Sequence, residues 1–302
     1  MQLYGLTGEP LRYFAMARSV VGIAWVPTTL SRMENSRLVP RQSRRYKAIV
    51  SLVVLAILIA GLATINAQSA SASTHRLCQR GQHIEVSSHG GRKFSLRNDF
   101  WGTRRFCLKN INRRPNFKVT RVGRNLLGGA VMSYPYVFTG CSWSICTRDS
   151  GLPARASSLR HPRATWHTSE HAKGRWNASF DLWFGKHRMT TGQATGAELM
   201  IWLNGRRLPL DSRHIVWVDG VRWYLSHWKA RARHGRKSWN YIQFRRVHPV
   251  WGVRNLRLNP FIHRAERSRL VRRWWWLLNI EAGFEVHSGG KGLVGRKFWA
   301  RA

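Results

Sequence analysis

Hydrophobic positions in the second half of the chain alternate with polar ones in short runs, which is the pattern of half-buried β-strands. Turn-forming Gly, Asn, Asp and Pro residues bound these runs. The runs that predict strands are Arg175–Phe184, Ala197–Leu203, Ile215–Val218, Val221–Leu225, Ser238–Phe244 and Leu277–Val286. Many short strands separated by turns are typical of β-sandwiches and barrels, so we expect an all-β domain.

Two of these runs pair an apolar face with a mixed one, because alternate residues of a strand point to opposite sides. The apolar faces carry Leu199, Ile201 and Leu203 in one run and Trp176, Phe180, Leu182 and Phe184 in the other. We expect them to form a core between two sheets. The mixed faces carry Glu198, Met200 and Trp202, and Asn177, Ser179, Asp181 and Trp183. Solvent-facing surfaces seldom hold such aromatic side chains, so the mixed faces indicate a carbohydrate cleft.

One segment, Pro260–Trp276, predicts a short helix, since Ile262, Ala265 and Leu270 recur among arginines. After residue 73 the chain shows no repeat and no Pro-, Ser- or Gly-rich linker. Residues 74–302 are therefore expected to form one domain.

The N-terminal part has the order of a secretory signal: basic Arg41–Lys47, the uncharged apolar run Ala48–Ile65 and the small residues Asn66–Ser73. We expect a signal peptide over residues 33–73, with residues 1–32 as an upstream extension or a mis-assigned start. An uncleaved membrane anchor is the alternative. Both interpretations place the domain outside the cytoplasm, either secreted or anchored and facing outward.

All four cysteines lie in the part expected to be exported: Cys78, Cys107, Cys141 and Cys146. An even number in an exported chain indicates disulfides. Three pairings are possible, and the local one, Cys78 with Cys107 and Cys141 with Cys146, is the simplest. Zinc is a poor alternative because no CxxC pair is present, and we expect no metal.

Acidic residues are scarce, with 13 Asp and Glu against 51 Lys and Arg and a net charge of +38. Glu198 and Glu285 nevertheless lie among apolar and aromatic neighbours, where an unpartnered carboxylate costs several kcal/mol. Two such carboxylates are what a glycosidase needs, one as acid and one as nucleophile or base. The alternative is that each is a strand residue that faces solvent or an arginine.

Five motifs in order resemble those of glycoside hydrolase family 12, above all the endoglucanases of actinobacteria, over residues 78–302. They are Asn98–Gly102 (NDFWG), Ser133–Phe138 (SYPYVF) with Cys141 and Cys146 after it, Asn177–Trp183 (NASFDLW), Glu198–Trp202 (ELMIW) and Gly283–Glu285 (GFE). The resemblance implies a β-jelly roll of two curved antiparallel sheets with a substrate cleft on the concave face. It also implies endo-hydrolysis of β-1,4-glucan with retention of configuration and no cofactor.

Carried over by position, the resemblance implies that Glu198 is the nucleophile, Glu285 the acid/base and Asp181 a carboxylate that hydrogen-bonds the nucleophile. Trp101 matches a sugar-stacking ring, and Met200 is expected beside the nucleophile. Asn177, Trp183 and Tyr134 lie within the matching motifs, and we expect them at the substrate too.

Two positions depart from the family pattern. Asp99 stands where the family usually has Asn, and an extra acid in a cleft can raise the pKa of a neighbouring group. His287 stands where Trp is frequent, which removes a stacking surface or shifts the pH optimum. We expect both residues at the substrate.

The charge of +38 is also far above the family's usual range. It indicates either drift in an arginine-rich proteome or attraction to anionic polymers such as those of cell walls. Nucleic-acid binding would need neither paired glutamates nor disulfides.

We expect a monomeric endo-β-1,4-glucanase with a β-glucan as its partner. The alternative is a non-catalytic glucan- or envelope-binding protein on the same scaffold.

Overall fold

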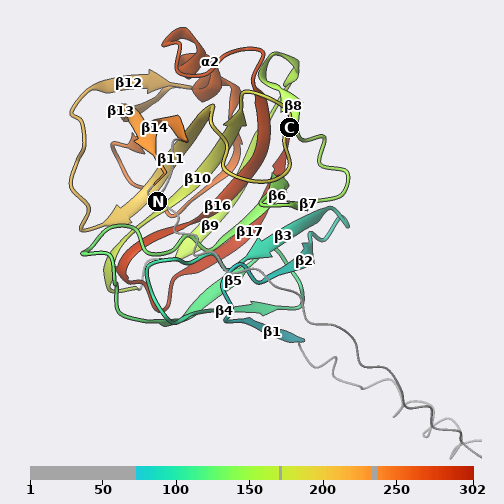
Figure 1. The fold of residues 1–302 in the computed structure, drawn as a ribbon, viewed down its shortest axis with the longest axis vertical. Helices are drawn as coiled ribbons and strands as arrows, with labels where there is room; N and C mark the ends of the chain where they lie inside the picture. Colours follow the sequence, from blue (N-terminus) through green and yellow to red (C-terminus); the bar gives the residue numbers. More distant parts are fainter. Residues whose placement is uncertain (1–72, 170–171, 233–236) are drawn as a thin grey trace, which may run out of the picture. The chain divides into compact units, whose positions relative to one another are not determined.

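The computed structural model describes residues 73–169, 172–232 and 237–302 (Figure 1). The predicted extension, residues 1–32, and all but the last residue of the predicted signal segment 33–73 lie outside the described residues. Within the described ranges, no helix is both long enough and apolar enough to cross a bilayer.

Two β-sheets pack face to face (Figure 1). The six-stranded sheet has the order β1 (Thr74–Leu77), β4 (Phe106–Ile111), β5 (Phe117–Val122), β17 (Val294–Arg301), β9 (Arg163–Ser169) and β15 (Gly252–Arg257). The larger sheet has the order β12 (Ile215–Val218), β13 (Val221–Arg231), β14 (Ser238–Arg246), β11 (Ala197–Arg206), β10 (Gly174–Gly185), β16 (Trp276–Gly289), β6 (Tyr136–Ser142), β3 (Lys93–Arg97) and β2 (His83–Ser87). Short strands β7 (Ile145–Cys146) and β8 (Ala154–Arg155) pair with β6 and β16.

The all-β sandwich is confirmed, and every strand predicted from alternation lies within an observed strand. Neighbouring strands run antiparallel except for β11 and β14, which are parallel. Strands β12 and β13 separate β11 from β14 in the chain and lie at the sheet edge, so β14 lies between β13 and β11.

The predicted apolar faces of β10 and β11 do form the core between the sheets. Behind the middle of β16, Phe284 is fully buried among three rings. Its ring centroid lies 5.1 Å from Trp166 of β9, 5.7 Å from Phe117 of β5 and 6.3 Å from Trp176 of β10. This aromatic cluster joins the two sheets directly behind the strand that carries Glu285.

The helix is shorter than the predicted Pro260–Trp276. Helix α2 covers Asn259–Arg267, and a single 3₁₀ turn (η1, Ala156–Ser158) lies elsewhere. The backbone N–H of Leu270 donates to the Ala265 carbonyl, and that of Arg269 donates to the Glu266 carbonyl, both at 2.9 Å. These two bonds form a Schellman motif, with Arg269 at a positive φ of 58° in the place that glycine usually takes. The chain then turns back so that Val271 and Trp275 enter the core.

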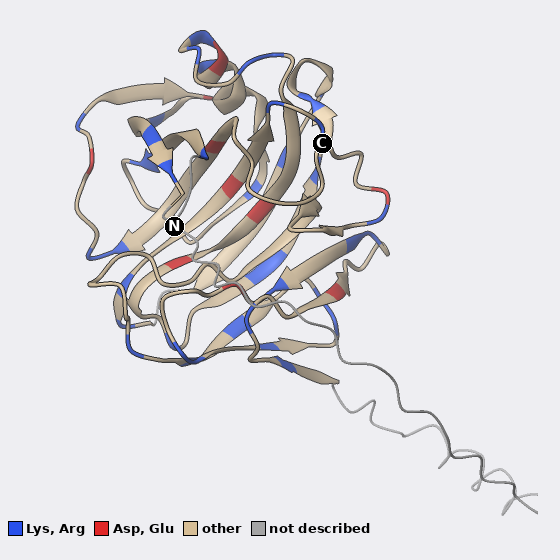
Figure 2. Cartoon of the chain, in the orientation of Figure 1, with Lys and Arg blue, Asp and Glu red and all other residues tan. Residues whose placement is uncertain are grey.

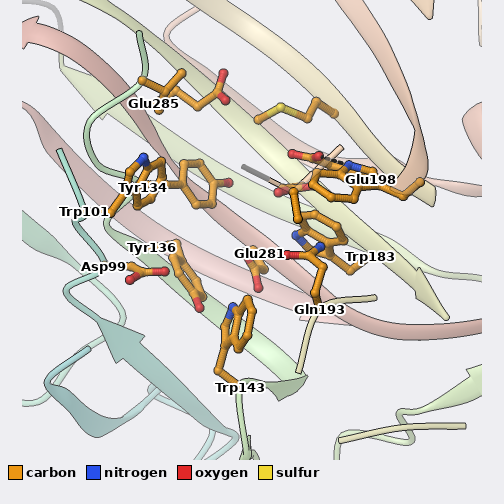
Figure 3. Close-up of a pocket in the computed structure, with 15 residues that line it drawn as sticks. Asp99, Trp101, Tyr134, Tyr136, Trp143, Trp183, Gln193, Glu198, Glu281 and Glu285 are labelled. Atoms are coloured by element: carbon orange, nitrogen blue, oxygen red, sulfur yellow. Dashed lines mark hydrogen bonds between the residues drawn. The ribbon is translucent and has the colours of Figure 1, made fainter. Parts of the chain in front are cut away.

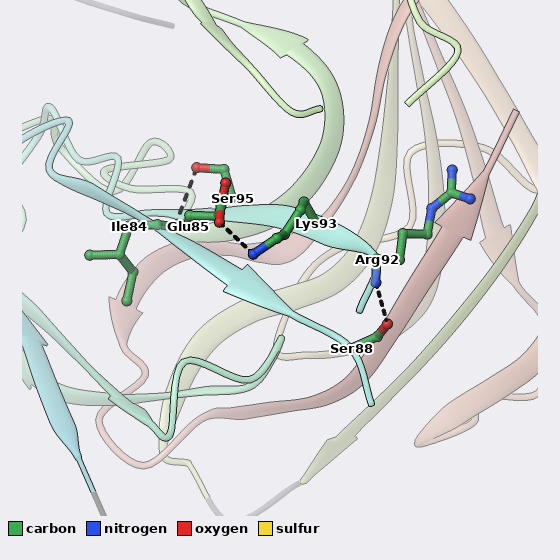
Figure 4. Close-up of polar contacts among 6 residues, drawn as sticks. All are labelled: Ile84, Glu85, Ser88, Arg92, Lys93 and Ser95. Carbon is green, nitrogen blue, oxygen red and sulfur yellow. Dashed lines mark hydrogen bonds and ion pairs between the residues drawn. The ribbon is translucent and has the colours of Figure 1, made fainter. Parts of the chain in front are cut away.

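The local disulfide pairing is confirmed: Cys78 bonds to Cys107, and Cys141 bonds to Cys146. The first ties the end of β1 to β4, and the second closes the turn between β6 and β7. At the edge of the larger sheet formed by β2, polar contacts stabilise the β2–β3 hairpin (Figure 4). The Arg92 N–H donates to Ser88 Oγ at 3.1 Å, and Lys93 Nζ lies 2.8 Å from Glu85 Oε1.

Replacing Phe284 with Ala is expected to lower the free energy of unfolding by about 3–5 kcal/mol, because it leaves a cavity between the sheets. Trp274→Ala is the matched control, since Trp274 is 57% exposed and its loss should cost about 0.5 kcal/mol or less. Chemical denaturation of both variants measures the difference. Equal losses in the two variants would show that the aromatic cluster does not join the sheets as described.

Candidate active site

The larger sheet carries a cavity on the face turned away from the core (Figure 3). Five of the chain's few acidic residues line it: Asp99, Asp181, Glu198, Glu281 and Glu285. Aromatic side chains make up most of the remaining wall: Trp101, Tyr134, Tyr136, Trp143, Trp183 and Trp239. The mixed strand faces predicted from alternation therefore meet in one place.

Strand register explains how these carboxylates converge. Strand β10 lies between β11, which carries Glu198, and β16, which carries Glu285. Along β10, Trp183 is opposite Glu198, and Asn177 is opposite Glu285. Asp181 lies between them on the same face, because residues two apart on a strand point the same way.

Glu198 is half-buried and accepts a hydrogen bond of 2.6 Å from Trp239 Nε1, which the dashed line in Figure 3 marks. Burial raises the pKa of Glu198 from its ordinary 4.5 to about 7, and the charge of Glu285 adds to the rise. The Trp239 N–H acts in the opposite direction, since it stabilises the carboxylate. The carboxyl of Glu198 can thus hold or release a proton near neutral pH.

Glu285 is half-buried as well, and its Oε2 accepts a hydrogen bond of 2.5 Å from Asn177 Nδ2. Burial raises the pKa of Glu285, while this bond lowers it. Asn177 is itself fully buried, and its Oδ1 accepts a 3.0 Å bond from Ser179 Oγ. Ser179 therefore fixes the amide so that its N–H group faces Glu285.

Asp181 and Glu281 form a second, deeper pair of acids. They are register partners across β10 and β16, with exposures of 3% and 2%. Ser142 Oγ donates to Glu281 Oε1 at 2.9 Å and lies 2.9 Å from the Tyr136 hydroxyl. Asp181 Oδ1 has no hydrogen-bond partner among the described residues. Burial raises the pKa of both carboxyls well above the ordinary range, and for Asp181 the charge of Glu198 contributes next.

The remaining predicted residues also reach the cavity or its margin. Trp101, Tyr134, Trp183 and Met200 line it (Figure 3). The Met200 sulfur accepts a 3.0 Å contact from the Tyr241 hydroxyl. Gly283, opposite Ser179, leaves room for Tyr134, because a Cβ at this position would lie 2.9 Å from the Tyr134 Cζ atom.

The two departures from the family pattern lie in different parts of the site. Asp99 is 8% exposed and lines the main cavity with Tyr136 and Glu281. His287 borders an adjoining groove with Trp202, Trp228 and Tyr241, and this groove also reaches Glu198 and Glu285. The His287 Nδ1 atom lies 3.0 Å from the Gly129 carbonyl oxygen, and burial lowers the pKa of the imidazole.

Sequence reasoning missed several cavity residues, above all Glu281 and Trp239. Glu281 stands four residues before Glu285 in a predicted strand, so alternation alone puts both on one face. Trp239 alternates with Tyr241 and Gln243 in the same way, but its contact with Glu198 depends on the parallel pairing of β14 with β11. No local pattern reveals that pairing. Among the described residues, no group of three or more His, Cys, Asp or Glu is arranged to hold a metal ion.

Comparison with known proteins gives a consistent picture. The family model of glycosyl hydrolase family 12 matches residues 93–300. Endoglucanase S of Pectobacterium parmentieri is 28% identical over 178 residues, which are 56% of this chain and 65% of that protein. The matched part of the chain thus spans just under two thirds of this curated relative.

Solved structures match over nearly their whole length. A metagenome-derived glycoside hydrolase family 12 endoglucanase is 34% identical with a TM-score of 0.68, covering 76% of this chain and 97% of that one. The endoglucanase Cel12A of Rhodothermus marinus is 34% identical with a TM-score of 0.67, covering 75% and 98%. The jelly-roll arrangement predicted from the motifs is therefore confirmed.

Glu281→Gln is expected to stabilise the protein increasingly as pH rises. A carboxyl whose pKa is raised in the folded state holds a proton that the unfolded chain releases, so stability falls as pH rises from about 4.5 through the folded pKa. Glutamine keeps the shape and has no such loss. Each pKa unit is worth about 1.4 kcal/mol, or roughly 3–6 °C in melting temperature for a domain of this size.

The measurement is the melting temperature of wild type and variant at pH 4 and pH 8. Asp149→Asn is the control, since Asp149 is exposed and lies outside the cavity. A difference between Glu281→Gln and wild type that stays constant over this range would contradict the buried, proton-holding state of Glu281.

Proposed function

The chain belongs to glycosyl hydrolase family 12, and we propose that it is a secreted endo-β-1,4-glucanase that cleaves internal bonds of a β-glucan with retention of configuration. The observation that carries this proposal is the meeting of Glu198 and Glu285 in one aromatic-walled cavity, from strands on either side of β10. Retaining glycosidases use such a carboxylate pair, held about 5–5.5 Å apart across the bond that breaks.

In the proposed reaction, ionised Glu198 attacks the anomeric carbon while protonated Glu285 donates its proton to the leaving oxygen. The glycosidic bond between the anomeric carbon and the leaving oxygen breaks, and the sugar remains covalently attached to Glu198. Glu285, now ionised, takes a proton from a water molecule, and the resulting hydroxide displaces Glu198 from the sugar. Two displacements at the same carbon restore the original configuration.

The surroundings of the two carboxyls support this division. Glu198 is bound by the Trp239 N–H, which stabilises the negative charge that a nucleophile must carry. The charge of Glu285 raises the pKa of Glu198, so the pair loses its protons in two separate steps. The reaction requires the state in which Glu198 is ionised and Glu285 holds the proton, and the Trp239 N–H favours the ionised form of Glu198.

Asp181, Asn177 and Ser179 act behind the pair. The unpartnered Oδ1 of Asp181 faces the same cavity as Glu198, so Asp181 is available to hydrogen-bond the nucleophile when one of them is protonated. Asn177, aligned by Ser179, orients Glu285. The substrate is a neutral polysaccharide under this proposal, since aromatic rings such as Trp101 stack on sugar faces and the acid-lined cavity disfavours an anionic chain.

Export of the chain is part of the proposal. The signal-like order of residues 33–73 and two disulfides in the domain that follows both fit an oxidising compartment. Under this proposal residues 74–302 act as a single catalytic unit.

Glu198→Gln is expected to lower hydrolysis of every glucan by more than about 10⁴-fold, because no nucleophile remains. Glu285→Gln is expected to lower hydrolysis of polysaccharides by about 10²–10⁴-fold. An aryl β-cellobioside has a leaving group that needs no proton, so Glu285→Gln should still form the glycosyl-enzyme from it and release a burst of phenolate. Glu198→Gln should give no burst. Reducing-end assays on carboxymethylcellulose, mixed-linkage glucan and xyloglucan, beside the aryl substrate, measure these effects and rank the substrates.

Lys291→Gln serves as the control for handling and folding, because Lys291 is exposed and lies outside the cavity and its adjoining groove. If the folded wild type binds glucan without any turnover, the proposal fails and the binding protein on the same scaffold takes its place. A burst from Glu198→Gln instead of Glu285→Gln would exchange the two roles.

A further inference from the structure

The six-stranded sheet presents a surface of one charge on its outer side. None of its six strands contains Asp or Glu. Its exposed basic residues are Arg76, Lys109, Lys118, Arg121, Arg254, Arg257, Arg296, Lys297 and Arg301. The acidic residues gather instead on the central strands of the larger sheet (Figure 2). The acid-lined cavity and the exposed basic residues of the six-stranded sheet therefore lie on opposite sides of the domain.

The basic residues on the outer side of the six-stranded sheet have few carboxylates near them. In the described part of the chain, the ion pairs are Lys93 with Glu85, in the β2–β3 hairpin (Figure 4), and Arg257 with Asp219, at the far end of β15. Neither pair involves β4, β5 or β17. The basic residues of these three strands are thus left without a carboxylate on their own sheet.

A groove runs along this surface between β4, β5 and β17. Lys109 and Lys118 lie directly opposite each other in the β4–β5 register, and Val294 of β17 is opposite Lys118 on its other side. Arg296 follows two residues along β17 on the same face. Like charges directly opposite on a sheet repel each other and destabilise it, and an anion in the groove would relieve that repulsion.

The groove has an apolar base and polar edges as well as charge. Ile111 of β4 is 45% exposed and lines the groove on one side of β5, and Val294 of β17 lines it on the other. Asn116 and Thr120 border the same space. Strand β17 pairs with β5 only at Val294 and Gly295, whereas its pairing with β9 extends from Val294 to Arg301. Apolar surface beside amide and hydroxyl groups suits a sugar ring with its hydroxyls, whereas a purely electrostatic contact would need neither.

We propose that this groove binds a carboxylate-bearing polysaccharide, whose acid groups lie between Lys109, Lys118 and Arg296 and whose rings rest on Ile111 and Val294. The groove lies on the outer side of one sheet and the catalytic cavity on the outer side of the other. A matrix of acidic polysaccharide would thus hold the domain while its cavity stays open to a neutral glucan. This binding is independent of the hydrolytic activity proposed above.

The test compares two triple variants of the full-length protein that lose equal charge. The groove variant is Lys109→Gln, Lys118→Gln and Arg296→Gln. The control variant is Arg188→Gln, Arg206→Gln and Arg213→Gln, all exposed residues outside the groove. Binding to immobilised polygalacturonate is measured at low and moderate salt. We expect the groove variant to bind about 10-fold or more weakly, with a flatter salt dependence, and the control variant to stay within about 3-fold of wild type.

A neutral variant, Ile111→Gln, separates sugar contact from charge. It should weaken binding to polygalacturonate by about 3-fold and leave binding to polyglutamate unchanged, because only the polysaccharide places rings on the groove base. Hydrolysis of mixed-linkage glucan by each variant monitors folding and activity independently.

Several outcomes would overturn the proposal. Equal losses in the two triple variants would mean that net charge alone attracts the polymer. Tighter binding of DNA than of polygalacturonate, lost in the groove variant, would assign the groove to nucleic acid. If Ile111→Gln weakens binding to polygalacturonate and to polyglutamate equally, the groove does not contact sugar rings and the proposal fails.

Discussion

The register of β10 between β11 and β16 is the constraint on which the rest of the site depends. It sets Trp183 beside Glu198 and Asn177 beside Glu285, and it places Asp181 against Glu281. The other face of β10 buries Phe180, Leu182 and Phe184 in the inter-sheet core. Because a strand alternates strictly, a shift of one residue would exchange the two faces, so core packing and the positions of the carboxyls are fixed together.

The cavity concentrates acids in a chain that is otherwise strongly basic. Burying several carboxyls together opposes their ionisation, and their pKa values are raised accordingly. Hydrogen bonds act against this, from Trp239 to Glu198, from Asn177 to Glu285, from Ser142 to Glu281 and from Trp183 to Asp181. The raised pKa values let carboxyls of the site keep a proton that they can transfer to a bound molecule, and acid–base catalysis uses this property.

The sequence predicts six strands of the larger sheet and the sides on which their residues lie, because a period of two is a local property. The strands of the smaller sheet were not among these predictions. The paired glutamates followed from residue type and setting, the local disulfide pairing was the simplest of three possibilities, and the matching motifs indicated the jelly roll. The helix was predicted too long because its end is formed by a positive φ at Arg269, where no glycine marks it. Glu281 was visible in the alternation of β16 and was overlooked. The contact of Trp239 with Glu198 was not visible, since it needs a parallel pairing between distant segments.

That parallel pairing also bears on the order in which the domain assembles. Strand β14 lies between β13, its neighbour in the chain, and β11, from which β12 and β13 separate it in sequence. Such nonlocal pairings close large loops and form slowly compared with neighbouring hairpins. Trp239 lies on this strand, so its hydrogen bond to Glu198 forms only when the nonlocal pairing of β14 with β11 is in place. Strand β16, which carries Glu281 and Glu285, follows β14 in the chain, so the acids of the cavity come together only when both β14 and β16 have joined the sheet.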